Sequence, residues 1–278
     1  MKIVIHPDYA HLAGYIRTIP ARFETSGHVL HEGRNCVKVF SVEGVRLAVK
    51  KYQVPNGFNR LMYTFFRKDK ATRAFRYAAR LRAMGVDTPQ EIAAIRIHRR
   101  GLFSTAYFVS LFCEYKPLSK VFGLKPLLYE GSHGRRIVDA FVRFTQELHA
   151  RGVEHKDYSL TNVLYREEPT GCRFALIDTN RMRFRKKMSK RVCLSNLRRL
   201  DCSLEAYLYV SRQYVLLRRW DPMKGVLGSM FCRGLFIHKQ QGKLRLKRLV
   251  GLADHPSIGI TLPGQIPLPE SGQVDWVI

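Results

Sequence analysis

A polar segment near the middle of the chain, Glu-His-Lys-Asp-Tyr-Ser-Leu-Thr-Asn at 154–162, constrains the fold more than any other feature. It follows a stretch of helical periodicity that begins at about residue 134, and it precedes a stretch of strand character. His155, Asp157 and Asn162 fit the spacing H-x-D-x-x-x-x-N. This spacing alone also fits a polar turn in which Asp157 caps the local backbone, so the surrounding sequence must decide between the two.

A second carboxylate stands at the end of the next apolar strand. Asp178 closes the run Phe-Ala-Leu-Ile-Asp, sixteen residues after Asn162. In kinases an Asp of the catalytic loop orients the attacking hydroxyl, an Asn five residues later binds metal, and an Asp after the following strand binds the metal on the nucleotide phosphates. The order predicts Asp157 as catalytic base, and Asn162 and Asp178 as ligands of Mg²⁺ bound with ATP.

The N-terminal third supplies a candidate phosphate-binding lysine. Three β-rich runs between Gly27 and Tyr52 are separated by turn formers, which predicts a three-stranded meander. The third run ends at Lys50, the position from which a kinase lysine reaches the α- and β-phosphates. Lys51 is the rival, and a solvent-exposed lysine on an edge strand is the structural alternative.

Two further stretches lie where nucleotide contacts are expected. The turn with Gly33 and Arg34 occupies the place of a phosphate-covering loop, although it has one glycine only and an ordinary hairpin fits almost as well. A strand predicted from about Ala106 ends at Glu114 and Tyr115, where the chain passes from one lobe to the other. We predict that backbone groups near these two residues bind adenine.

These elements predict an α+β, bilobal, protein-kinase-like fold, with a small β-rich N-terminal lobe and a larger, mainly helical C-terminal lobe. We assign residues 1–115 to the first lobe, with five strands and one helix over 69–84. Residues 116–252 form the second lobe, and its first segment, 116–126, is expected to be a linker. Residues 253–278 are expected to form an irregular tail rich in Pro and Gly.

The helix predicted over 69–84 departs from the kinase pattern. Kinases pair the strand lysine with a helix glutamate, whereas no acidic residue follows Asp69 in this helix, and Arg73 and Arg76 lie on it instead. Lys50 therefore pairs with Asp69, with a residue from elsewhere, or with no carboxylate. The last case would suit a kinase-shaped module without activity.

The net charge predicts an anionic partner. The chain has 48 Lys and Arg against 22 Asp and Glu, a formal net charge of +26. Nucleic acid, an acidic membrane surface and a phosphorylated substrate all fit this charge, and a merely solvated basic face is the alternative. Nine basic residues and no acidic one lie between Asp178 and Asp201: Arg181, Arg183, Arg185, Lys186, Lys187, Lys190, Arg191, Arg198 and Arg199. RNA ranks lower because this run has one aromatic side chain, Phe184, for base stacking.

Cysteine usage and the N-terminus predict a cytoplasmic protein. The six cysteines are scattered without a C-x-x-C pair, which is typical of reduced thiols. The first residues contain a three-residue apolar run, too short for a secretory signal. The apolar stretches are also too short to span a bilayer, so any membrane contact is expected to be peripheral.

At these residues the sequence resembles the lipopolysaccharide core kinases, which include the Kdo and heptose kinases. The resemblance covers roughly residues 28 to 200, and it includes Ile177-Asp178 followed shortly by Arg181. It implies transfer of the ATP γ-phosphate to a sugar hydroxyl of an anionic glycolipid, the lipid A–core precursor, at the cytoplasmic face of the inner membrane. It also implies that Arg181, Arg183 and Arg185 bind this substrate, and we expect no obligate protein partner.

Two other functions stay open at this point. One is a non-catalytic, kinase-shaped module that binds anionic lipid or nucleic acid. The other is a kinase of proteins or small soluble alcohols, although no Ala-Pro-Glu follows Asp178 as it does in regulated protein kinases. His155 is expected to brace the backbone of the loop in each case.

Overall fold

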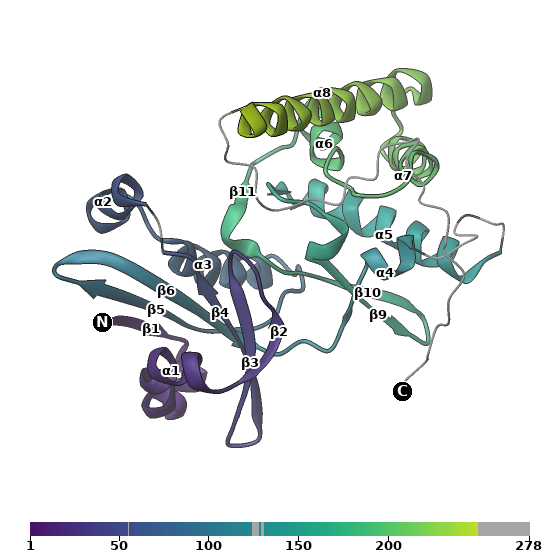
Figure 1. The fold of residues 1–278 in the computed structure, drawn as a ribbon. Coiled ribbons are helices and arrows are strands. Elements are labelled where there is room, and N and C mark those ends of the chain that lie inside the picture. The colour runs from purple at the N-terminus through teal and green to yellow at the C-terminus, as the bar shows by residue number, and fades with distance from the viewer. Residues whose placement is uncertain (55, 124–127, 129–130, 250–278) are drawn as a thin grey trace, which may run out of the picture.

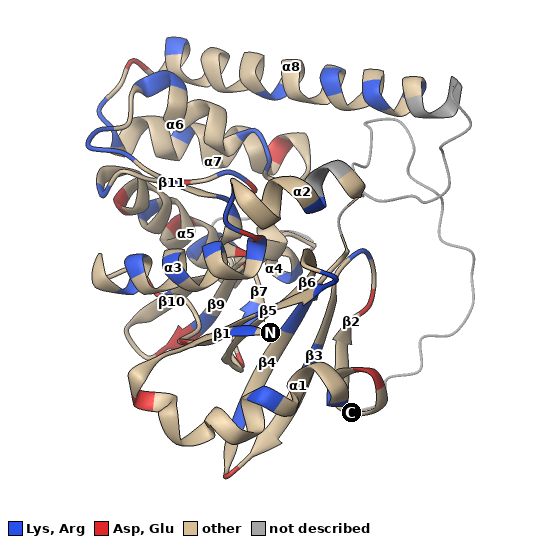
Figure 2. Ribbon diagram, turned by 90° about the vertical axis from the view of Figure 1, so that its left-hand side faces the viewer, with Lys and Arg blue, Asp and Glu red and all other residues tan. Residues whose placement is uncertain are grey.

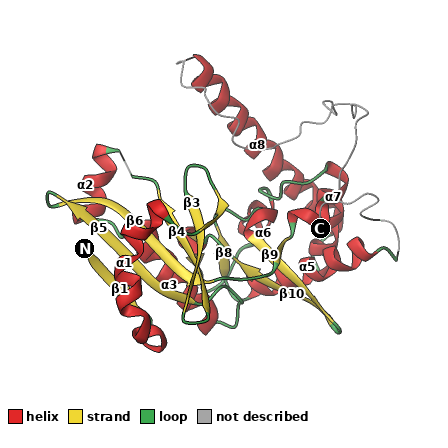
Figure 3. Ribbon diagram, turned by 60° about the horizontal axis from the view of Figure 1, so that its bottom comes forward, coloured by secondary structure: helices red, strands yellow, loops and turns green. Residues whose placement is uncertain are grey.

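The structure, a computed structural model, describes residues 1–54, 56–123, 128 and 131–249. It has two lobes, one built on a β-sheet and one mainly helical (Figures 1 and 3). This arrangement confirms the predicted α+β, bilobal fold class. The expected irregular tail over 253–278 lies outside the described residues.

The N-terminal lobe is built on a six-stranded antiparallel sheet with the order β1-β5-β6-β4-β3-β2. The strands are β1 Lys2–Ile5, β2 His28–His31, β3 Cys36–Val42, β4 Val45–Tyr52, β5 Glu91–Arg99 and β6 Leu102–Leu111. The predicted meander is confirmed as β2, β3 and β4. The expectation of five strands was wrong, because β1 adds an edge strand that pairs with β5.

Strand β6 begins and ends earlier than predicted. Arg100 and Gly101 both have positive φ, 51° and 77°, which closes the β5–β6 hairpin with a tight turn and starts β6 at Leu102. The strand ends at Leu111, which pairs with Leu47 of β4. The chain beyond it, including Glu114 and Tyr115, is therefore a connection between lobes and not a strand.

Three α-helices accompany this sheet where one was predicted: α1 Ala13–Thr25, which follows the 3-10 helix η1 Pro7–Leu12, α2 Gly57–Phe65 and α3 Lys70–Ala83. Ile16 and Ile19 of α1 are fully buried against one face of the sheet, in a cluster with Leu47 and Val49 of β4. Helix α1 has Pro20 in its interior and lacks a side-chain cap, so its sequence carries little helical signal. Helix α3 covers the opposite face and matches the prediction.

The C-terminal lobe contains short strands, five α-helices and two 3-10 turns in its described part. These are β7 Lys116–Pro117, α4 Ser119–Phe122, α5 His133–Ala150, β8 Val153–His155, η2 Leu160–Asn162, β9 Val163–Glu168, β10 Gly171–Leu176, η3 Thr179–Arg181, β11 Met182–Phe184, α6 Lys190–Leu197, α7 Leu204–Leu217 and α8 Pro222–Leu249. The predicted linker over 116–126 instead begins with β7, which pairs with β9, and α4. Its residues 124–126 lie outside the described residues.

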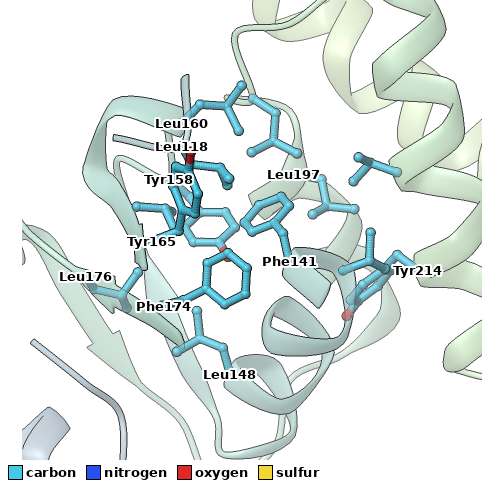
Figure 4. Packing of buried hydrophobic residues seen from close by; sticks show 14 of the residues in the cluster. Leu118, Phe141, Leu148, Tyr158, Leu160, Tyr165, Phe174, Leu176, Leu197 and Tyr214 are labelled. Carbon is cyan, nitrogen blue, oxygen red and sulfur yellow. The ribbon is translucent and has the colours of Figure 1, made fainter. Parts of the chain in front are cut away.

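Aromatic side chains build the core beneath the polar segment. Phe141 of α5 stacks on Tyr158, with ring centroids 6.0 Å apart, and Phe174 of β10 packs against Phe141 (Figure 4). The Tyr158 hydroxyl is buried and shares a 2.8 Å hydrogen bond with Thr145. Burial of these rings contributes about 1.5–3 kcal/mol each and anchors the segment that follows β8.

The turn between α5 and β8 leaves no room for a side chain. Gly152 has φ of 75°, and a Cβ atom there would lie 1.9 Å from the Arg185 carbonyl oxygen. The Arg185 N–H donates to the Gly152 carbonyl at 2.8 Å. This close approach aligns β8 with β11, which pair along Val153–His155.

Hydrogen bonds tie the two lobes together beside the polar segment. The Leu176 N–H donates to the Asp87 carbonyl at 2.9 Å, and the Thr88 hydroxyl donates to the Leu176 carbonyl at 2.7 Å. The Thr179 hydroxyl donates to the Ala74 carbonyl of α3 at 3.1 Å. The start of the segment after β10 is therefore held against the N-terminal lobe.

Candidate active site

A cavity of about 640 Å³, here called the cleft, lies between the lobes. The sheet contributes Ala48 and Lys50 from β4, and the C-terminal lobe contributes Asn162 and Asp178. Tyr115 lines the cleft at the connection between the lobes. The described lining is thus apolar toward the connection and charged toward Lys50 and Asp178.

Lys50 and not Lys51 faces the cleft. Side chains alternate along β4, so Lys51 lies on the face that α1 covers, where it pairs with Glu24. The Lys50 Nζ lies 2.9 Å from a carboxylate oxygen of Asp178, on the other lobe. The structure therefore places Lys50, and not Lys51, in the cleft. It also shows that the carboxylate partner of Lys50 comes from the C-terminal lobe and not from α3.

The Asp69 carboxylate caps the N-terminus of α3. The carboxylate accepts from the Thr72 N–H at 3.0 Å and from the Thr72 hydroxyl at 2.6 Å, which makes Asp69 the N-cap of the helix. Arg96 of β5 completes its contacts with a 2.8 Å ion pair. Because these partners bind a fully buried carboxylate, Asp69 is not the partner of Lys50.

Asp178 is held in an unusual backbone conformation at the end of the cleft. Its φ of 54° and ψ of 45° are left-handed, and it follows β10 by two residues. The Asn180 side chain donates a hydrogen bond to its carboxylate. Burial alone raises the pKa of Asp178, but the Lys50 ammonium and the hydrogen bonds from Lys50 and Asn180 hold that pKa below its ordinary value. Asp178 is therefore an anion in the cleft.

His155 and Asn162 brace the loop that carries Asp157. The Asp157 N–H donates to His155 Nδ1 at 3.1 Å, and His155 Nε2 donates to the Ile177 carbonyl at 3.0 Å. Burial lowers the pKa of His155, which fits a neutral ring with these two contacts. The Asn162 Nδ2 donates to the Asp157 carbonyl at 2.9 Å. The predicted bracing role of His155 is thereby confirmed.

Two arginines surround the Asp157 carboxylate. Arg199 Nη1 lies 2.8 Å from one oxygen, and Arg181 Nη1 lies 3.8 Å from the other. The Arg199 guanidinium also stacks on Phe236 of α8, 4.9 Å from the ring centroid. Sequence reasoning placed Arg199 within a basic run but did not connect it to Asp157, because the contact joins residues 42 positions apart.

Further hydrogen bonds hold the loop from the side of α6 and α7, and no local sequence pattern predicts them. Asp201 accepts from the Leu160 N–H at 2.9 Å. The Asn196 side chain donates to the His155 carbonyl at 2.8 Å, and it accepts from His149 at 3.0 Å. The Tyr214 hydroxyl lies 2.7 Å from the other nitrogen of His149, whose pKa burial lowers to about 4. This chain links α7, α5 and α6 to the loop.

The predicted substrate-binding arginines are not equivalent. Arg181 lies near Asp157, as above, and Arg185 forms a 2.8 Å ion pair with Glu154 of β8. Arg183 is exposed on β11 and pairs in register with Glu154. Lys and Arg residues occur in both lobes, so the basic charge is not confined to this run (Figure 2).

The residues predicted to contact nucleotide divide into two groups. Tyr115 lines the cleft, whereas the Glu114 side chain is exposed and pairs with Arg46 at 2.6 Å. Gly33 and Arg34 occupy the turn between β2 and β3, and the cleft is lined there by their neighbours His31 and Asn35. The turn thus borders the cleft, and its roles in binding stay predictions.

The oxygen donors at the charged end of the cleft suit Mg²⁺. Asn162 uses its Nδ2 for bracing, so its carbonyl oxygen is left for a ligand, and Asp178 offers a carboxylate nearby. Within the described ranges no group of three or more His, Cys, Asp or Glu side chains could hold a metal ion. This donor set fits Mg²⁺, which binds through one or two carboxylates together with substrate phosphates.

Comparisons with known proteins agree with this geometry. A family model described as the lipopolysaccharide kinase (Kdo/WaaP) family matches residues 24–219. A solved structure titled "WaaP in complex with acyl carrier protein" is similar in fold, with a TM-score of 0.57 and 17% sequence identity, over 87% of this chain and 99% of that one. No curated protein matches the sequence.

Proposed function

Because the chain belongs to the lipopolysaccharide kinase (Kdo/WaaP) family, we propose that it transfers the γ-phosphoryl group of ATP to a sugar hydroxyl of a lipid A–core precursor. Members of this family are kinases that act on lipopolysaccharide. The family membership confirms the resemblance found in the sequence and makes the chain an enzyme of the kinase class. The nucleotide, the metal and the acceptor hydroxyl are the parts that we propose.

The observation that carries this proposal is that Lys50, Asn162 and Asp178 line the cleft together, next to the loop that carries Asp157. Lys50 and Asp178 meet across the lobes at 2.9 Å, while Asn162 is hydrogen-bonded to the backbone of Asp157 at 2.9 Å. Phosphoryl transfer depends mainly on alignment and charge neutralisation, and these four groups supply both.

Each side chain has a role in the proposed reaction. Lys50 binds the α- and β-phosphate oxygens and so holds the nucleotide against the sheet. Asp157 accepts a hydrogen bond from the sugar hydroxyl, orients it toward the γ-phosphorus and takes its proton as the bond to phosphorus forms. Asp178 and Asn162 hold Mg²⁺, which neutralises phosphate charge when bound. Adenine lies at the apolar end, near Tyr115.

The acceptor is proposed to be an anionic glycolipid at the cytoplasmic face of the inner membrane. The net charge of +26 supports it, as do Arg181, Arg183 and Arg185 next to the loop. No helix in the described part of the chain could cross a bilayer. Four apolar side chains on α8 are more than half exposed at four-residue intervals, which supports peripheral association: Met223, Leu227, Phe231 and Leu235.

The similar WaaP structure bears on protein partners. From sequence we expected no obligate partner, whereas that structure was solved together with acyl carrier protein. A carrier protein therefore belongs among the proposed partners of this chain. Its binding would be measured directly with purified acyl carrier protein.

The test is ATP turnover with Mg²⁺, measured with and without a purified lipid A–core acceptor. We expect acceptor-stimulated turnover in the wild type, its loss in Asp178→Asn, and its retention in Asp8→Asn, which changes an exposed aspartate of the N-terminal lobe. Absence of turnover in the wild type, together with salt-dependent binding to anionic vesicles or RNA, would favour the non-catalytic module instead.

A further inference from the structure

The first turns of α3 place two cations, Lys70 and Arg73, on the same helix face as a residue of the cleft lining. Lys70, Arg73 and Ala74 stand at positions i, i+3 and i+4, which share one face of a helix. Ala74 lines the cleft, and its carbonyl accepts from Thr179 next to Asp178. The face of α3 on which kinases carry a glutamate therefore carries positive charge in this chain.

Lys70 and Lys50 converge on the same aromatic ring. The Nζ atoms of Lys50 and Lys70 lie 5.6 Å and 5.9 Å from the centroid of the Tyr52 ring. Tyr52 lines the cleft and also a second cavity of about 340 Å³, to which Lys70 contributes. Lys70 therefore places a cation in a cavity that adjoins the cleft at Tyr52, near Lys50.

These cations have no counterion among the described residues. Asp178 is paired with Lys50, and Asp69 is occupied by Arg96 and Thr72. In the described ranges no carboxylate lies within ion-pair distance of Lys70, Arg73 or Arg34, and the Arg73 Nε is buried without a hydrogen-bond partner. Lys70 and Arg73 are half-buried, whereas Arg34 is exposed, and half-buried charges that repel one another are costly unless an anion joins them.

The electrostatic surroundings of Lys70 agree with this geometry. Burial lowers the pKa of the Lys70 ammonium, and the charges of Arg34 and Arg73 lower it further. Asp178 acts in the opposite direction but is shared with Lys50. An anion with several charged oxygens would relieve the repulsion among all these cations at once.

We propose that Lys70, assisted by Arg73 and Arg34, forms a phosphate-binding site at the start of α3, where other kinases place the glutamate that pairs with the strand lysine. The identity of its ligand rests on the proposed function. The nucleotide offers its terminal phosphates, and a glycolipid acceptor can offer a phosphate group of its own. Both ligands share the same oxyanion chemistry, and a binding experiment separates them.

The experiment compares Lys70→Met with Lys68→Met, a matched control that removes an exposed lysine two residues away. Calorimetric titrations with Mg²⁺ measure the affinity for a non-hydrolysable ATP analogue, for ADP and for adenosine. We expect Lys70→Met to weaken binding of the triphosphate by about 10- to 100-fold, with adenosine unchanged, because one charge-assisted contact is lost. Lys68→Met should bind all three ligands as the wild type does, and Lys70→Arg should restore most of the affinity.

A parallel titration with the purified lipid A–core acceptor separates the two sources of phosphate. If Lys70→Met weakens only acceptor binding, the phosphate site stands and belongs to the acceptor. Unchanged affinity of Lys70→Met for both triphosphate and acceptor, in a variant whose thermal unfolding matches the wild type, would overturn the inference and leave the proposed function intact. If the wild type binds no nucleotide, the proposed function fails, and the acceptor titration alone decides the phosphate site.

Discussion

The two carboxylates of the candidate active site, Asp178 in the cleft and Asp157 on the neighbouring loop, are neutralised in different ways. Asp178 meets Lys50 from the other lobe, so its ion pair crosses the cleft. Asp157 meets Arg199 and Arg181 from its own lobe. We call these two regions the Asp178 end and the Asp157 end.

The difference has a consequence for binding. At the Asp178 end, nucleotide and Mg²⁺ would compete with the pair itself, since the lysine and the carboxylate each gain a new partner. At the Asp157 end the arginines can remain in place while a hydroxyl arrives. We therefore expect the Lys50–Asp178 ion pair to rearrange on binding, and the contacts of Asp157 with Arg199 and Arg181 to be retained.

The largest effect is expected at the Asp157 end. Replacing Asp157 with Asn keeps the size of the side chain but removes the base, so kcat for transfer should fall by about 10²- to 10⁴-fold. Nucleotide affinity should change little, because Asp157 faces the hydroxyl and not the triphosphate. Steady-state kinetics with a binding titration measure both, and a comparable loss of nucleotide affinity would argue against separate roles for the two ends.

Acid should destabilise the fold through protonation of His149, which is buried beside the loop that carries Asp157. The pKa of this histidine is about 4 when folded, below its ordinary value of 6.5, so the unfolded chain binds this proton more readily. The free energy of unfolding should therefore fall as the pH drops from about 6.5 to 4, by up to about 3 kcal/mol. His155, whose pKa burial also lowers, acts in the same direction.

Urea unfolding at a series of pH values measures this loss. His149→Gln keeps a hydrogen-bonding side chain but cannot take up the proton, so its stability should depend less steeply on pH in that window. An identical slope in wild type and variant would mean that other groups cause the acid sensitivity.

Breaking the pair at the Asp178 end should affect binding first. Lys50→Met removes the contact to the α- and β-phosphates, and the affinity for ATP should fall by about 10- to 100-fold. The matched control is Lys51→Met, because the Lys51 side chain lies on the face of the sheet that α1 covers. An equal loss of nucleotide affinity in both variants would contradict the proposed contact of Lys50 with the phosphates.

The smallest effect is expected from the stacking that supports Arg199. Phe236→Ala removes the ring beneath this guanidinium, a contact of about 0.5–1 kcal/mol. We expect kcat to fall by no more than about fivefold, with unchanged affinity for ATP. Leu244→Ala, at an exposed position of the same helix outside the four side chains proposed to meet the membrane, should have no effect on kcat.

Sequence was sufficient for the parts of the molecule that depend on local pattern. The spacing of His155, Asp157 and Asn162 identified the loop, and the apolar run before Asp178 identified the second carboxylate. The helix α3 was predicted over 69–84 because its apolar residues recur at helical spacing. The catalytic roles of these residues stay predictions.

Contacts between distant segments were beyond sequence reasoning. Nothing near Arg199 or Asp201 indicates that they contact the loop, because the folding of α6 and α7 onto it creates both contacts. The choice between Lys50 and Lys51 depends on which face of β4 is covered by α1. This helix was not predicted, because Pro20 in its interior weakens its helical signal. In each case tertiary packing supplies information that the local sequence lacks.

Gly152 carries a consequence for how this protein tolerates genetic variation. It lies outside the cleft, yet any side chain there would displace the Arg185 carbonyl and part β8 from β11, the strands that lead into the loop and away from Asp178. In a library of all single substitutions selected for activity, position 152 should be almost depleted of variants. The exposed residue before it, Arg151, should accept many replacements, so a sharp boundary in tolerance would separate two neighbouring codons.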